Sequence, residues 1–360
     1  MSCSVLFVGF LLLPNSPKQE GAQQMKQGIL LEEFIYEEAP FPSCHASTVA
    51  QAADGSLVAA WFGGTDEGNR DVGIWVSRKE KDEWSDPIEV ANGIQSDGKR
   101  FPCWNPALFQ SQEGPLLLFF KVGPNPRQWW GEMMVSSDHG KTWTDRRALP
   151  DNGIGPVKNK PVQLSDGTLI CGSSIENDGW RVHVERTSDL GKTWETTGPL
   201  HGKEIGAIQP TIFNHGEGRL QMLCRDRNGK GHHWETWSQD GGKTWSPFSA
   251  TELPNPNAGA DGVTLRDGTH LLVYNHTVRG GPFPQSREML NVAVSPDGKK
   301  WDAALVLERS NGEYSYPAVI QAESGMIHIT YTWKRRKIKH VVVDPAQLER
   351  VPIEEGVWPH

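Results

Sequence analysis

Ionisable side chains recur in short segments that each follow an apolar run. The segment "GGTDEGNRD" contains Asp66, Glu67 and Asp71, whose carboxylates could donate or accept protons. Arg225 in "LCRDR" and Arg287 in "SREML" could hold a carboxylate through the fork of a guanidinium group. Because the chain has a net charge of −8, an acidic ligand would need such a local cluster of cations. These residue types suit proton transfer on an acidic molecule.

A second group of polar residues stands at the start of six apolar segments. The segments are "CHAST", "CWNPAL", "KNKPVQL", "AIQPTI", "GADGVTL" and "EYSYPAV". Imidazole, phenol, amide and ammonium groups at such starts could bind or activate a polar substrate. The candidates are His45, Trp104 or Asn105, Asn159 or Lys160, Gln209, Asp261, and Tyr314 or Tyr316.

The elements that must position these residues are given by an internal repeat. "SSDHGKTW" at residue 136 returns as "TSDLGKTW" at residue 187 and as "SQDGGKTW" at residue 238, 51 positions apart each time. A shortened copy, "SPDGKKW", begins at residue 295. The Asp and Gly of this string suit a tight turn, and the Trp suits packing between neighbouring units. The string is therefore predicted to be structural rather than catalytic.

Each repeat unit has the pattern of four short strands. The second unit reads as "NPALFQ", "PLLLFFKVG", "WGEMMVSSD" and "TWTDRRALP", with a turn signal between successive runs. Six such units can be counted, and the sixth lacks a fourth strand. The segment "ILLEEFIYE", residues 29–37, is left over and could supply it, which would close the ring. The predicted fold is an all-β propeller of six four-stranded antiparallel blades, closed by the N-terminal strand.

In a propeller the starts of the inner strands meet at the axis, and the loops between second and third strands join them on the same face. This arrangement would bring the two groups of candidates together. Arg181 in "WRVHVER" would lie near the same opening, at the start of a third strand.

The turn strings and the count of six units resemble the exo-sialidase superfamily over about residues 34–348. Members of that family hold a substrate carboxylate with three arginines and use a tyrosine nucleophile helped by a glutamate, with an aspartate as acid/base. By resemblance, "GEYSYPAVIQ" places Tyr314 as nucleophile, "LQMLCRDR" and "SREMLNVAVSPDG" place Arg225 and Arg287 as two of the arginines, and the first-blade loop offers Asp66, Glu67 or Asp71 as acid/base.

Two positions depart from the family pattern. His45 stands where the family has its first arginine, and Gln209 stands near the position of the helper glutamate. Glutamine cannot act as a base, so activation of the tyrosine needs another group. Lys160 could replace the missing cation, and Glu313 could replace the glutamate.

Three functions fit these residues. The first is an exo-acting glycoside hydrolase that removes a terminal acidic sugar. The second is a lyase or dehydratase on a uronic acid, in which His45 or Tyr314 takes a proton while Arg225 and Lys160 neutralise the carboxylate. The third is a glycan-binding propeller without catalysis. The expected partner is an acidic glycan in each case.

Composition excludes other classes of function. The net charge of −8 argues against a broad grip on nucleic acid, and no apolar run reaches the 18 residues of a membrane span. No closely spaced ligand pairs indicate a metal site, and no cofactor is expected. The five cysteines show no tight pairing and are predicted to be buried free thiols.

The N-terminus has the apolar run "SVLFVGFLLL", which suits the core of a secretory signal. We expect residues 1–24 to be a signal peptide or a disordered start, and residues 25–360 to form a single propeller domain. The protein is accordingly expected to be secreted or periplasmic.

Overall fold

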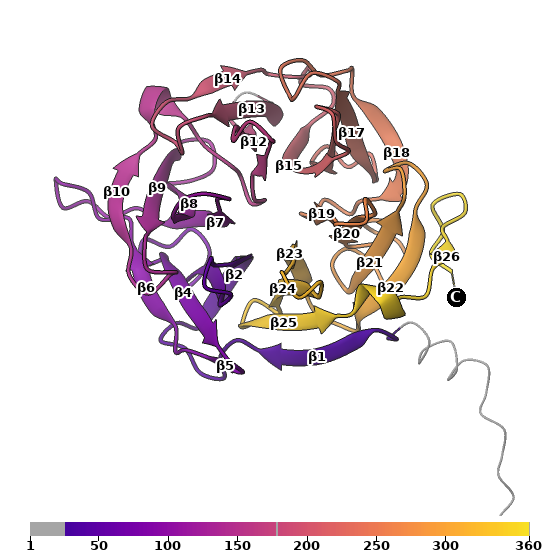
Figure 1. Ribbon diagram of the computed structural model, residues 1–360, viewed down its shortest axis with the longest axis horizontal. Coiled ribbons are helices and arrows are strands. Elements are labelled where there is room, and N and C mark those ends of the chain that lie inside the picture. Colours follow the sequence, from indigo (N-terminus) through magenta and orange to yellow (C-terminus); the bar gives the residue numbers. More distant parts are fainter. Residues whose placement is uncertain (1–25, 178, 360) are drawn as a thin grey trace, which may run out of the picture.

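The computed structural model describes residues 26–177 and 179–359. Within these ranges the chain forms six antiparallel sheets, arranged as blades round a central axis (Figure 1). The prediction of an all-β propeller with six four-stranded blades is confirmed. The apolar segment at residues 4–13, predicted to belong to a signal peptide, lies outside the described residues. No helix in the described part of the chain is long and apolar enough to cross a bilayer.

In the first five blades the strands succeed one another in chain order from the axis outwards. The first blade consists of β2 (Ser43–Gln51), β3 (Leu57–Gly64), β4 (Gly73–Glu80), and both β5 (Glu83–Trp84) and β6 (Ile88–Ala91), which pair with β4. The second consists of β7 (Cys103–Gln110), β8 (Leu116–Val122), β9 (Trp130–Ser136) and β10 (Thr144–Ala148). The third consists of β11 (Val162–Gln163), β12 (Leu169–Ile175), β13 (Arg181–Thr187) and β14 (Glu195–Thr197).

The remaining blades follow the same plan. The fourth consists of β15 (Ala207–Asn214), β16 (Leu220–Asp226), β17 (His232–Ser238) and β18 (Ser249–Pro254). The fifth consists of β19 (Asp261–Thr264), β20 (His270–Tyr274), β21 (Met289–Ser295) and β22 (Asp302–Arg309), with β26 (Val351–Pro352) added outside β22. The sixth contains β23 (Tyr314–Gln321), β24 (Ile327–Trp333) and β25 (Lys337–Val343). Two short 3₁₀ helices within the described ranges, η1 (Pro150–Asn152) and η2 (Pro345–Gln347), lie in connections.

The sixth blade is completed by the N-terminal strand β1 (Ile29–Phe34), as predicted. This strand lies beside β25 (Figure 1). The two strands are antiparallel, and Glu33 is paired with His340. Glu33 accepts hydrogen bonds from Trp84 Nε1 at 2.9 Å and from Lys79, both in the first blade, and contacts His340 Nδ1 at 2.8 Å. One carboxylate therefore joins the first and last blades of the ring.

The repeated turn string has the structural role predicted from the sequence. In the third blade, Asp189 Oδ1 accepts the backbone N–H of Thr193 at 2.9 Å, and Asp189 Oδ2 accepts the Thr193 hydroxyl at 2.7 Å. Trp194, which follows, packs on Phe119 of the second blade with ring centroids 6.1 Å apart. The turn thus fixes the third-to-fourth strand connection, and its Trp sets the spacing of adjacent blades.

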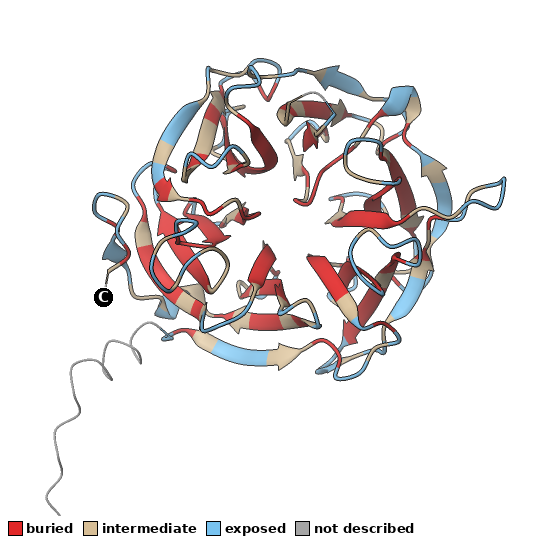
Figure 2. Cartoon of the chain, turned by 180° about the vertical axis from the view of Figure 1, so that it is seen from behind, coloured by how far each residue is buried: buried red, intermediate tan, exposed pale blue. Residues whose placement is uncertain are grey.

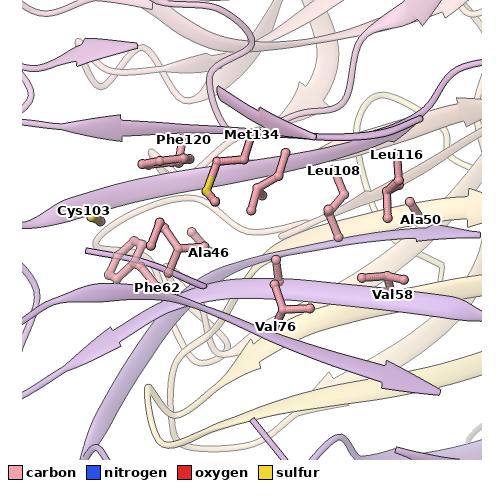
Figure 3. Close-up of a cluster of buried hydrophobic side chains, with 14 of the residues drawn as sticks. Ala46, Ala50, Val58, Phe62, Val76, Cys103, Leu108, Leu116, Phe120 and Met134 are labelled. Carbon is pink, nitrogen blue, oxygen red and sulfur yellow. The ribbon is translucent and has the colours of Figure 1, made fainter. Parts of the chain in front are cut away.

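The core consists of apolar layers between adjacent blades, and the outer strands are the more exposed ones (Figure 2). The layer between the first two blades contains Val58 and Val76 from one and Leu116, Phe120 and Met134 from the other (Figure 3). Each fully buried side chain of this kind stabilises the fold by about 1.5–3 kcal/mol. The four cysteines among the described residues are buried and free, as expected.

Candidate active site

Four of the six inner strands carry a bulge at the axis, and this bulge decides which residues face one another. The pairing of the inner strand with its neighbour shifts register within β2, β7, β15 and β23. At each shift one residue has a positive φ, a conformation that costs a non-glycine residue about 1–2 kcal/mol. These residues are Ala46 (57°), Asn105 (38°), Gln209 (50°) and Tyr316 (51°). Strain repeated at one place in a fold motivates a functional hypothesis for that place.

Tyr316 is the centre of the resulting cluster. Its hydroxyl accepts hydrogen bonds from Arg225 Nη1 at 2.6 Å and from Gln209 Nε2 at 3.1 Å. Arg225 also donates to Gln209 Oε1 at 2.9 Å and to Asn257 Oδ1 at 2.7 Å. The guanidinium carbons of Arg225 and Arg287 lie 5.8 and 5.4 Å from the centre of the Tyr316 ring. Two of the predicted arginines therefore meet at one tyrosine.

The structure separates the two tyrosines of "EYSYP". Tyr314 is 1% exposed and lies in the apolar layer between the fifth and sixth blades, with its hydroxyl 2.5 Å from Ser310 Oγ. Residues two apart on a regular strand face the same side, but the bulge and positive φ at Tyr316 break that rule. Tyr316, and not Tyr314, is thus the tyrosine that contacts Arg225 and Gln209.

An ion-pair network lies beside this cluster. Glu313 accepts from Arg287 Nη1 at 2.7 Å and from Arg335 Nε at 2.9 Å, and Arg335 also pairs with Glu67. Burial alone would raise the pKa of Glu313, but the guanidinium groups of Arg287 and Arg335 hold that pKa well below the usual range. The carboxylate of Glu313 therefore already forms ion pairs with two arginines.

His45 is buried against Tyr316, with ring centroids 4.1 Å apart. Its Nδ1 lies 3.0 Å from the hydroxyl of Thr332. Burial, with the added charge of Arg335, lowers the pKa of His45 well below its ordinary value. The neutral imidazole is therefore favoured at neutral pH, so His45 does not supply a permanent positive charge.

Lys160 and Asp261 form an ion pair with each other. Lys160 Nζ lies 2.9 Å from Asp261 Oδ2 and 2.8 Å from the carbonyl oxygen of Gly262. Asp261 also accepts from the Thr211 hydroxyl at 3.1 Å and from the backbone N–H of Val319 at 2.9 Å. Through this ion pair and these hydrogen bonds, Asp261 contacts the third, fourth and sixth blades. Lys160 was predicted to replace a missing cation, but its charge is already matched by Asp261.

The lysine beneath the tyrosine is Lys158, which the sequence analysis did not single out. Its Nζ lies 6.0 Å from the centre of the Tyr316 ring and donates to Asn159 Oδ1 at 2.8 Å, to Ala260 O at 3.0 Å and to Pro317 O. Burial lowers the pKa of Lys158 to about 7. One signal pointed towards it, namely the polar run "KNKP" at a strand start.

The remaining predicted residues make local contacts in their own blades. The Asp66 carboxylate accepts a hydrogen bond from the backbone N–H of Glu67 at 2.9 Å, and the Asp71 carboxylate accepts one from the Thr65 hydroxyl at 2.7 Å. Asn105 is buried at the bulge of β7, and Arg181 begins β13. Their roles stay predictions.

Glu176 is a carboxyl with unusual acid–base properties in the loop after β12. Burial raises its pKa to about 7, against the lowering influence of Arg225, Arg227 and Arg127. Glu67 adds to the increase, so the two carboxylates act on each other electrostatically. A carboxyl with such a pKa is protonated often enough near neutral pH to act as a general acid. Within the described residues, no group of three His, Cys, Asp or Glu side chains could hold a metal ion.

Comparison with known proteins relates this arrangement to one family. Residues 55–329 match the model of the BNR repeat-like domain. A sialidase from Clostridium perfringens is 27% identical over 117 residues, which are 30% of this chain and 29% of that protein. A sialidase from Paraclostridium sordellii is 36% identical over 80 residues, 22% of this chain and 19% of that protein. The matched segments span less than a third of these relatives.

Solved structures agree in fold over most of the chain. A protein of unknown function from Dyadobacter fermentans gives a TM-score of 0.74 at 15% identity, covering 88% of this chain and 99% of that one. The NanB sialidase of Streptococcus pneumoniae gives 0.70 at 12% identity, covering 93% and 73%. The intramolecular trans-sialidase of Ruminococcus gnavus gives 0.68 at 13% identity, covering 91% and 98%. At these identities the likeness concerns the fold.

Proposed function

Because this chain belongs to the BNR repeat-like domain family, within the exo-sialidase superfamily, we propose that it is an exo-acting glycoside hydrolase that removes a terminal carboxylated sugar from a glycan. The observation that carries the proposal is the Tyr316 hydroxyl, which is hydrogen-bonded by Arg225 beside a second arginine, Arg287. This cluster offers a nucleophile and two cations within reach of one sugar ring.

In this proposal the two arginines bind the sugar carboxylate, because guanidinium groups suit bidentate recognition of carboxylates. Tyr316 attacks the anomeric carbon, and the bond to the leaving oxygen breaks. The guanidinium of Arg225 stabilises negative charge that develops on the phenol oxygen. A water molecule then hydrolyses the glycosyl–tyrosine intermediate. The nucleophile is thus assigned to Tyr316 in place of Tyr314.

Two proton transfers accompany the first step, and both are reversed in the second, when the loop carboxylate takes a proton from the attacking water and the phenol oxygen regains its own. We assign the phenol proton to His45, whose ring packs on Tyr316 and which would accept the proton through one water molecule. A loop carboxyl protonates the leaving oxygen. Asp66 and Glu67 are the candidates from the sequence, and Glu176 joins them because its pKa is raised to about 7.

One observation favours a second candidate, a lyase acting on a uronic acid. Gln209 contacts the Tyr316 hydroxyl at the position where a hydrolase of this superfamily would use a glutamate. A tyrosine paired with a neutral histidine and cations suits removal of a proton beside a carboxylate. In that reaction Tyr316 or His45 would act as the base, and no glycosyl–enzyme bond would form.

Turnover of sialyllactose and of a uronic-acid oligosaccharide should separate these functions. Tyr316→Phe removes the phenol oxygen and should lower kcat by about 10²-fold or more, whereas Tyr314→Phe should keep most of it. Hydrolysis gives free sugar without new near-ultraviolet absorbance, and elimination gives an absorbing unsaturated product. Full activity in Tyr316→Phe would refute the assignment of Tyr316 as nucleophile. A product that absorbs in the near ultraviolet would show that the protein is a lyase.

A further inference from the structure

A pocket of about 280 Å³ adjoins the arginine–tyrosine cluster through Asn257. It lies between the loop after β16, the segment before β19 and the loop after β20. Its lining comprises Arg227, Asn228, Gly229, Gly231, Asn255, Pro256, Asn257, Val278 and Arg279.

Asn257 forms a wall shared by this pocket and the site. Its side-chain oxygen accepts from Arg225 Nε at 2.7 Å, and its backbone oxygen accepts from Arg287 Nη2 at 3.2 Å. Asn257 also has a positive φ of 63°, so the backbone is turned here. Asn257 alone would therefore separate a molecule in the pocket from Arg225 and Arg287, the two arginines proposed to bind the carboxylate.

The pocket contains two arginines whose charges are not matched by an ion pair. Among residues 26–177 and 179–359, neither Arg227 nor Arg279 forms an ion pair with a carboxylate, although Arg227 lowers the pKa of Glu176 from a longer distance. Arg227 stacks on Trp180, with the guanidinium carbon 4.2 Å from the ring centre, which fixes its position. By contrast, Arg287 and Arg335 share Glu313. Unmatched cations in a pocket are available to an anionic ligand.

The rest of the lining suits a sugar. Asn257 offers its side-chain NH2 group to a hydroxyl, and Asn228 offers its side-chain oxygen, because the NH2 group of Asn228 already donates to the carbonyl oxygens of Lys203 and Glu204. The backbone at Gly229 faces open space, since an added side-chain carbon there would meet nothing within 4 Å. Val278, which is 53% exposed, provides an apolar edge that a sugar ring could cover. The pocket thus combines hydroxyl-binding groups, an apolar contact and two cations.

We propose that this pocket is a subsite for the sugar on the leaving-group side, and that it selects a sugar bearing an anionic group, either a carboxylate or a sulfate. The assignment rests on the proposed hydrolysis of a terminal carboxylated sugar, because that reaction leaves the second sugar next to Arg225. The preferred substrate then has two anionic sugars in succession, one held by Arg225 and Arg287 and the other by Arg227 and Arg279.

The test measures binding of three monosaccharides to the full chain by calorimetry. The probes are galactose 6-sulfate, glucuronic acid and neutral galactose. One or both anionic sugars should bind at least about tenfold more tightly than galactose, and the stronger of the two identifies the anionic group. Arg227→Gln and Arg279→Gln should each weaken that binding by about tenfold, as expected for loss of a hydrogen bond between charged groups. Arg350→Gln, at an exposed arginine outside the pocket, should leave the binding unchanged.

A second measurement separates this pocket from the proposed reaction. The kcat/KM values of sialyllactose with and without a 6-sulfate on galactose are compared. The sulfated form should have the higher kcat/KM because its KM is lower, and Arg279→Gln should abolish this difference in KM. Equal binding of galactose and both anionic sugars, or binding unaffected by both arginine variants, would overturn the subsite. Selective anion binding without turnover of either glycoside would refute the hydrolase and the leaving-group role, leaving an anion-binding pocket.

Discussion

The two arginines of the candidate site differ in whether a carboxylate already neutralises their charge. Arg225 donates to neutral oxygens of Gln209, Asn257 and Tyr316, whereas Arg287 pairs with Glu313. We therefore expect Arg225→Ala to weaken binding of a carboxylated monosaccharide by about 1.5–3 kcal/mol, and Arg287→Ala to weaken it by less. Calorimetry with N-acetylneuraminic acid measures both. Unchanged affinity in the two variants would contradict the carboxylate site, and a larger loss in Arg287→Ala would reverse the order proposed here.

Glu176 provides a prediction about pH. A general acid works in its protonated form, and the pKa of Glu176 is raised to about 7, so this form is lost as pH rises through that value. If Glu176 protonates the leaving group, kcat/KM should fall above pH 7. Glu176→Gln should lower the maximal rate and remove the alkaline limb near pH 7, because glutamine does not titrate. Glu67→Gln serves as the comparison, and an alkaline limb that persists in Glu176→Gln but vanishes in Glu67→Gln would move the acid to the first-blade loop.

At the level of elements, the closure strand β1 depends on Glu33. Burial alone would raise the pKa of this carboxyl, but hydrogen bonds with His340, Lys79 and Trp84 lower it to about 2. A carboxyl whose pKa is lower in the folded state contributes stability above its unfolded pKa, near 4.5, and loses this contribution as pH falls towards 2.

We expect Glu33→Gln to lower the free energy of unfolding at pH 7 by about 1–3 kcal/mol and to flatten the loss of stability between pH 4.5 and pH 2. Denaturant unfolding at a series of pH values measures both effects. Glu38→Gln, at an exposed carboxylate shortly after β1, should change neither. A variant as stable as the parent at pH 7 would show that the hydrogen-bonded strand ladder alone closes the ring.

The sequence was sufficient for the strands because their signals are local. Alternating apolar runs, the Asp–Gly turns and the repeat of 51 residues each depend on a few neighbouring residues, and they predicted the six blades and the strand β1. The bulges at the inner strands are different, because a register shift depends on pairing with the next strand. The sequence therefore left Tyr314 and Tyr316 as alternatives, and the resemblance favoured Tyr314, which lies in the core.

At the scale of the whole molecule, the sequence predicted which loops and strand starts would meet, but not which charges would cancel. Lys160 pairs with Asp261 across blades, and Glu313 bridges Arg287 and Arg335. Such pairs join residues far apart in the chain, and their partners become known only once the ring is built. Within the part of the chain that the structure describes, Arg225, Arg227 and Arg279 form no ion pair with a carboxylate, and the proposed function and the proposed subsite depend on these three arginines.

Closure of the ring by β1 also has a consequence for biosynthesis. A ribosome makes β1 among the first strands and its partner β25 among the last, about 300 residues later. At about 5–20 residues per second, β1 waits roughly 15–60 s for that partner to be made. During this interval the nascent chain exposes an unpaired strand at one end and an incomplete row of blades at the other. Both are surfaces that chaperones protect from aggregation, so the ring can form as a whole only after translation of the last blade.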